Sequence, residues 1–170
     1  DQIREEFERQ AIINLDTYLD ASCPQIIHHH LVERPEDYAR LFSEAPVSDV
    51  LIGECSTSYL ISKDAPKAIL EYNPDSLFVA IIRDPVSRIR SHHKMDLQIG
   101  LESRDLTTCV KQEIKLGPRA NYSNCRNYLN VSGYTEQLER WKSTVGENKV
   151  LVLVFEELIR DPDPVLDQLY

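Results

Sequence analysis

Positive charge is scarce in this sequence, and long apolar runs are missing. The 28 aspartates and glutamates outnumber the 19 lysines and arginines, which leaves a net charge of −9. Nonspecific nucleic-acid binding needs a basic face, so this balance argues against that function. A small anionic ligand remains compatible with it, because a few basic residues in one pocket can bind an anion. No stretch of about 18 apolar residues occurs, so no membrane-spanning helix is predicted.

Cysteine is also sparse and widely spaced. The four cysteines form no Cys-x-x-Cys pair, and a chain of this length does not need disulfides to fold. We therefore expect free, mostly buried thiols, although any pairing is left open. Two Asn-x-Ser triplets, at Asn121 and Asn130, would matter only in a secreted chain.

Apolar runs alternate with amphipathic segments along the chain. LFVAII (residues 77–82) and KVLVLVF (149–155) predict strands buried on both faces, and VSDVLIGE (47–54) predicts a shorter strand. Helical spacing or start signals favour further elements. They are helices over residues 1–19, from 35, 65–72, 85–99, 132–145 and from 164, the last with Asp163 as N-cap, whereas the polar segment 100–127 has no clear periodicity.

This alternation predicts an α/β fold, a parallel sheet flanked by helices, with ligands beyond the carboxyl ends of the strands. We expect one domain over residues 1–170. The sequence begins without Met at DQIREEFERQ and stops at VLDQLY within an amphipathic pattern. We therefore expect a fold that is incomplete at both ends.

The junction RDPVSRIRSHH (residues 83–93) is the strongest candidate site. Asp84 fits an N-cap and Pro85 the first helical position, so a strand ends and a helix begins within two residues. The helix N-terminus then faces the ligand crevice, with Arg83 on its rim and Ser91 two turns into the helix. An arginine, a hydroxyl and a helix end together suit a phosphate group. Equally, Arg83 could form a salt bridge and Ser91 could face solvent.

Four segments, in order, resemble the PAPS-dependent sulfotransferases. In that family a strand ends in an arginine, followed by Asp/Asn-Pro and a serine eight residues after the arginine, here Arg83 and Ser91. The resemblance implies that both bind the 3′-phosphate of 3′-phosphoadenosine 5′-phosphosulfate (PAPS), with the product PAP. It also implies a P-loop-NTPase-like fold. The other matching segments are EDYARLF (36–42), IGECSTSYL (52–60), and GYTEQLERW (133–141) followed by KVLVLVFEELIRDP (149–162).

The sequence departs from the family at its beginning. Family members start with a strand and a glycine-rich loop carrying a lysine, which cradles the 5′-phosphosulfate. None of the five glycines here opens such a loop. Either the sequence lacks this part, or it is a sulfotransferase-like binding module that has lost catalysis. A kinase would need Walker-type residues, which are equally missing.

A histidine-rich stretch and one glutamate supply the candidates for the catalytic base. The stretch QIIHHHL (residues 25–31) matches the place where relatives carry a base, and His28 aligns best; a metal site or an unreactive segment is the alternative. Glu54, at the end of the predicted strand 47–54, could serve as base, orient the acceptor, or pair with an arginine. Glu156 and Glu157 fit a structural role at a strand end.

The acceptor is predicted from the resemblance, and the compartment from charge and sequence motifs. The resemblance is closest to carbohydrate-type members, so a glycan is the first expectation; a lipid or small alcohol stays open. Acceptor specificity is expected from residues 100–127. An acidic chain without a signal suits the cytoplasm, whereas the Asn-x-Ser triplets would suit the Golgi lumen if an N-terminal anchor was removed.

Overall fold

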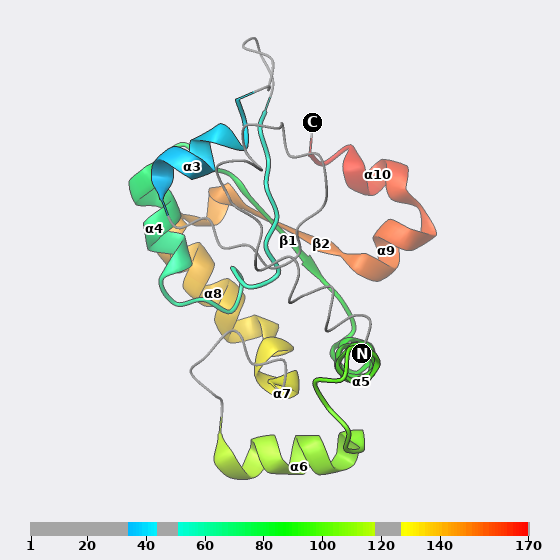
Figure 1. The fold of residues 1–170 in the computed structure, drawn as a ribbon. Coiled ribbons are helices and arrows are strands. Elements are labelled where there is room, and N and C mark those ends of the chain that lie inside the picture. Colours follow the sequence, from blue (N-terminus) through cyan, green and yellow to red (C-terminus); the bar gives the residue numbers. More distant parts are fainter. Residues whose placement is uncertain (1–33, 44–50, 118–126, 170) are drawn as a thin grey trace. The chain divides into compact units, whose positions relative to one another are not determined.

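The computed structural model describes residues 34–43, 51–117 and 127–169 (Figure 1). The chain divides into two compact units, Asp1–Cys55 and Ser56–Tyr170, which are described separately. The single domain expected from the sequence stays a prediction. The helix predicted for residues 1–19 lies outside the described residues.

In the first unit, α3 spans Pro35–Arg40 and begins at the residue that the sequence predicted. The Asp37 carboxylate accepts hydrogen bonds from Arg34 Nε at 2.6 Å and from Arg40 Nη1 at 3.1 Å. The strand predicted for residues 47–54 is wrong in its described part, because residues 51–54 form neither helix nor strand. Leu51 and Ile52 are exposed there, and no neighbouring described strand offers them backbone hydrogen bonds.

In the second unit, two parallel strands form the described sheet. β1 (Phe78–Ile82) pairs with β2 (Val150–Val154) in a register that runs from Phe78 opposite Val150 to Ile82 opposite Val154. The strands predicted for residues 77–82 and 149–155 are therefore confirmed, and each observed end lies within one residue of the predicted one. Along the chain, helices lie between the two strands and after the second one (Figure 1). The α/β fold class is therefore confirmed.

The helices of this unit largely follow the predicted ranges. The predicted ranges do not include α6, which lies within the polar segment 100–127, or the short helices α7, η1 and α9. The last helix, α10, begins at Pro162 rather than at Pro164, with Asp161 and not Asp163 as its N-cap residue. The bounds are α4 Ala65–Tyr72, α5 Pro85–Gln98, α6 Leu106–Leu116, α7 Tyr128–Val131, α8 Tyr134–Val145, the 3₁₀ helix η1 Glu147–Lys149, α9 Phe155–Arg160 and α10 Pro162–Leu166.

One face of the sheet packs on α8. The ring of Trp141 meets the ring of Phe78 edge-on, with 5.0 Å between centroids, and the Trp141 side chain is buried. The opposite face is covered unevenly. Leu153 of β2 is 3% exposed, whereas its register partner Ile81 and the neighbouring Val79 are each 51% exposed. Burial on both faces was therefore predicted wrongly for β1, because no described element covers its outer face.

None of the described helices combines the length and the apolar composition that crossing a bilayer requires. The compartment in which the chain works stays a prediction.

Candidate anion-binding site

The junction between β1 and α5 has the geometry that the sequence predicts. β1 ends at Ile82 and α5 begins at Pro85. Between them, Asp84 Oδ1 accepts a hydrogen bond from the backbone N–H of Ser87 at 2.7 Å. Hydrogen bonds from the Ser87 hydroxyl and from this N–H lower the pKa of the Asp84 carboxyl. The cap therefore fixes the position where the helix begins.

Arg83, the last residue before the cap, has hydrogen-bonding capacity to spare. Its Nε is buried and has no hydrogen-bond partner. The guanidinium carbon lies 5.0 Å from the centroid of the Phe155 ring, a cation–π distance that holds the group over the ring. No described carboxylate forms an ion pair with Arg83, so the salt-bridge alternative is not seen in this part of the chain. A buried donor without a partner is unfavourable, and an anionic oxygen would supply the missing acceptor.

A second contact ties the two strand ends together. The backbone N–H of Asp84 donates to Glu156 Oε1 at 3.0 Å, and Glu156 lies in the first turn of α9. Glu156 therefore has the structural role expected from the sequence. With the contact between Arg83 and Phe155, this bond joins the start of α5 to the start of α9.

Ser91 lies in α5 and is exposed to solvent. It follows Ser87 by four residues, so both hydroxyls lie on the same face of the helix. At 1.5 Å per residue, the Cα of Ser91 is about 10 Å along the helix axis from that of Asp84. The Arg83 side chain and the anion together would have to span this distance, so a shared anion stays a prediction.

The structure does not describe where the other predicted site residues lie relative to this junction. His28 lies outside the described residues, as do the neighbouring histidines. Glu54 is exposed and belongs to the first unit, whose placement relative to the junction is not described. Both remain candidates for the base. Within residues 34–43, 51–117 and 127–169, no group of three or more metal-ligating side chains occurs.

Phe155 is a site residue that sequence reasoning missed, although a signal existed. The two apolar runs pair with Ile82 opposite Val154. The residues that follow, Arg83 and Phe155, therefore emerge next to each other at the same edge of the sheet. An aromatic residue at the end of the second apolar run was the available signal.

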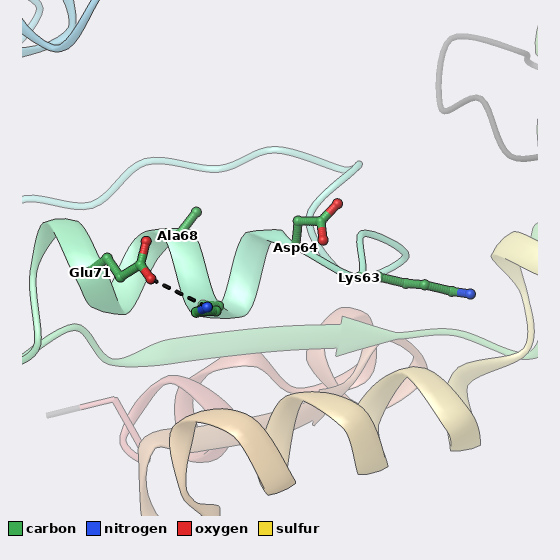
Figure 2. A pocket seen from close by; sticks show the side chains of 5 residues that line it. Lys63, Asp64, Ala68 and Glu71 are labelled. Carbon is green, nitrogen blue, oxygen red and sulfur yellow. Dashed lines mark ion pairs between the residues drawn. The ribbon is translucent and has the colours of Figure 1, made fainter.

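A shallow depression beside α4 offers little to a ligand. It is lined by Lys63, Asp64, Lys67, Ala68 and Glu71 (Figure 2), none of which was predicted as a site residue. Lys67 Nζ lies 3.7 Å from Glu71 Oε1, and both side chains are mostly exposed. Opposite charges thus neutralise each other in open solvent, where such pairs contribute little.

Known proteins resemble this chain over most of its length. The model of the sulfotransferase family matches residues 5–170. Human heparan sulfate glucosamine 3-O-sulfotransferase 5 is 27% identical over 114 residues, which are 66% of this chain and 33% of the relative. Human heparan sulfate glucosamine 3-O-sulfotransferase 3B1 is 25% identical over 109 residues, or 64% and 27% of the two chains.

A solved structure agrees with these matches. The crystal structure of a sulfotransferase from Alicyclobacillus acidocaldarius superimposes with a TM-score of 0.71 at 26% identity, covering 81% of this chain and 55% of that one. The matched part of the chain spans between about a quarter and a third of the length of the heparan sulfate relatives. The parallel strands, the capped helix and the family match agree, and the chain belongs to the sulfotransferase family.

Proposed function

We propose that this chain forms part of a sulfotransferase that uses PAPS as its donor, and that Arg83 and Ser91 bind the donor's 3′-phosphate. One observation carries the proposal: Arg83 has a buried Nε without a hydrogen-bond partner, at the carboxyl end of a parallel strand and beside a capped helix. That position is where α/β folds bind phosphates.

The residues present fit a phosphate monoester. The guanidinium can donate two parallel hydrogen bonds to phosphate oxygens, and the ring of Phe155 restricts its motion. The Ser91 hydroxyl can donate a further bond from α5. The first turn of this helix adds the positive end of its dipole, although Asp84 already occupies the N–H of Ser87.

The proposed reaction is a single group transfer. The donor supplies an activated sulfuryl group on its 5′-phosphate. An acceptor oxygen or nitrogen forms a bond to sulfur while the bond from sulfur to the phosphate oxygen breaks, and that oxygen keeps the electron pair as PAP departs. The acceptor's proton goes to a general base. His28 and Glu54 are the candidates for this base.

We propose a carbohydrate as the acceptor class. The heparan sulfate glucosamine 3-O-sulfotransferases are named for a glycan, and they are similar to this chain over about two thirds of it. The segment 100–127, which includes α6, is the proposed contributor to acceptor specificity, because loops that follow a binding element commonly contact the substrate.

Nucleotide selectivity tests the donor proposal. PAP and adenosine 5′-monophosphate (AMP) differ by the 3′-phosphate alone, so thermal unfolding is followed with each. PAP at 100 times its dissociation constant should stabilise by about 2.7 kcal/mol, or roughly 5–10 °C for a chain of this size, whereas AMP should act only at higher concentration. Equal effects of PAP and AMP would reject the donor site and favour a binding module without a donor.

Ser91 is tested by a matched pair of serine variants. Ser91→Ala should weaken PAP binding by about two- to tenfold, the range of one lost hydrogen bond, and leave AMP binding unchanged. Ser143→Ala is the control, because Ser143 is an exposed helical serine of α8 whose hydroxyl donates to the Arg140 carbonyl. Equal binding by both variants would remove Ser91 from the site.

A further inference from the structure

α5 presents two rows of polar side chains, each with a spacing of four residues. The outer row consists of Ser87 and Ser91. The inner row, one residue further on, consists of Arg88, His92 and Asp96, of which Asp96 is fully buried and the other two are half-buried. One residue is a rotation of about 100°. Whatever fixes the inner row therefore also fixes the direction in which α5 presents Ser91.

Tyr128 holds the far end of the inner row. Its hydroxyl donates to Asp96 Oδ2 at 2.9 Å, and both side chains are 0% exposed. The other oxygen, Oδ1, is buried and has no hydrogen bond; His92 Nε2 lies 3.8 Å from it. Burial raises the pKa of Asp96 and lowers that of His92. The hydroxyl of Tyr128 is therefore the principal described partner of this buried carboxyl.

Further contacts bind the same helix face to α7 and the residue after it. Arg88 Nη1 donates to Ser132 Oγ at 3.3 Å, and the Ser132 hydroxyl donates to the carbonyl of Tyr128 at 2.7 Å. The His92 ring meets the Tyr128 ring edge-on, with centroids 5.0 Å apart. Two points on α5, eight residues apart, are thus bonded to one short segment.

That segment is itself held from the other side. Glu113 of α6 accepts hydrogen bonds from the backbone N–H groups of Leu129 at 3.0 Å and Asn130 at 2.9 Å. These are free donors of the first turn of α7, which such a carboxylate satisfies. α7 therefore has a fixed position from which Tyr128 and Ser132 reach α5.

Hydrogen bonds constrain rotation more strictly than apolar contacts do, because they require distance and angle together. An apolar inner face would let α5 turn or slide slightly at little cost, whereas a turn here would leave buried polar groups without partners. We propose that Tyr128 and Asp96 are positioning residues of the 3′-phosphate site, which set the rotation of α5 and so direct Ser91 toward the anion bound by Arg83. This inference rests on the proposed donor site.

The test compares affinities for PAP and AMP, measured calorimetrically on the whole 170-residue chain. Tyr128→Phe keeps the ring and removes the hydroxyl. It should lower the ratio of PAP to AMP affinity by about two- to tenfold. Asp96→Asn should keep the ratio near that of the unchanged protein, since its amide oxygen still accepts from Tyr128 and its NH₂ can face His92 Nε2.

Trp141→Phe is the matched control. It removes one part-buried hydrogen bond, from Trp141 Nε1 to the Leu60 carbonyl at 3.1 Å, and part of the ring that packs on Phe78, both outside α5, so it should lower the melting temperature and leave the ratio unchanged. A purely structural role for Tyr128 predicts the same result for Tyr128→Phe, and that result would overturn the inference.

Failure of the donor site has a different signature, because the unchanged protein itself would then bind PAP and AMP equally. If Tyr128→Phe does not fold, Ser132→Ala replaces it. This variant removes the contact with Arg88 and should lower the ratio as well; an unchanged ratio in a folded Ser132→Ala would also overturn the inference.

Discussion

The tripeptide Arg-Asp-Pro occurs twice in the second unit, and its two copies lie in different surroundings. The first (residues 83–85) follows β1 and begins α5, a helix of 14 residues. The second (160–162) follows α9 and begins α10, a helix of 5 residues. Proline opens the helix in both. Asp84 accepts a hydrogen bond from the Ser87 N–H, whereas the Asp161 side chain makes no capping bond.

The two arginines differ still more. Arg83 is half-buried, with its guanidinium over Phe155 and its Nε unpartnered. Arg160 is exposed in the last turn of α9. The tripeptide therefore determines where a helix begins, but the parallel strand before it determines whether the arginine reaches a ligand position. Substituting the residues of each copy in turn separates the effect of the tripeptide from the effect of the preceding strand.

The largest expected difference concerns the arginines. Arg83→Ala should weaken PAP binding by about 30-fold or more, the usual effect of removing one partner of a buried charged pair. Arg160→Ala removes the same charge from an exposed position and should change the affinity less than about twofold. Isothermal titration of both variants measures this. Similar losses in the two variants would mean that PAP senses only the overall charge of the protein.

The aspartates should differ in their effect on stability. Asp84→Ala removes a cap and should lower the free energy of unfolding by about 1 kcal/mol. Asp161→Ala removes no capping bond. It should lower the free energy of unfolding by no more than a few tenths of the loss expected for Asp84→Ala. Urea unfolding compares the two, with Asp84→Asn as a control that keeps a capping oxygen. Equal losses would show that the bond to Ser87 adds nothing to stability.

Much of the fold was predictable because its signals are local. Two apolar runs gave β1 and β2, and Asp84 with Pro85 gave the start of α5. α6 was missed because its buried residues include Cys109 and Glu113, so an apolar period could not reveal it; its Asp105 cap, which accepts from the Thr108 N–H at 3.0 Å, was the available signal.

Other errors came from tertiary context. Two consecutive Asp-Pro pairs left the start of the last helix ambiguous, and the sequence alone favoured Asp163 over Asp161. The sequence also did not reveal that Val79 and Ile81 are half-exposed. An apolar run indicates a strand, but it does not indicate which face of the strand another element covers. Arg83 was predictable from its position after a strand, whereas Phe155 needed the register of the sheet. His28 rests on resemblance, and Glu54 was predicted from the end of a strand that residues 51–54 do not form.

The smallest expected effect is a pH dependence of stability that arises from Asp84 in the first copy. In the folded chain the pKa of Asp84 lies below its ordinary value of 3.8, because of hydrogen bonds from the Ser87 hydroxyl and N–H. A lowered folded pKa stabilises the fold above the unfolded pKa, and this stabilisation is lost as the pH falls through the folded value. Asp84→Asn caps the helix without a charge. At neutral pH the unchanged protein should therefore be more stable than Asp84→Asn, because only the carboxylate carries a charge that the helix dipole favours, and the difference should shrink below about pH 4.

Urea unfolding of both proteins between about pH 2 and pH 7 measures this difference. In a Ser87→Ala background the difference should be smaller at neutral pH and should vanish at a higher pH, because the hydroxyl that most strongly lowers the folded pKa of Asp84 is gone. A difference that grows on acidification would mean that the carboxylate of Asp84 destabilises the junction. Ser87 would then act on α5 through its backbone N–H alone.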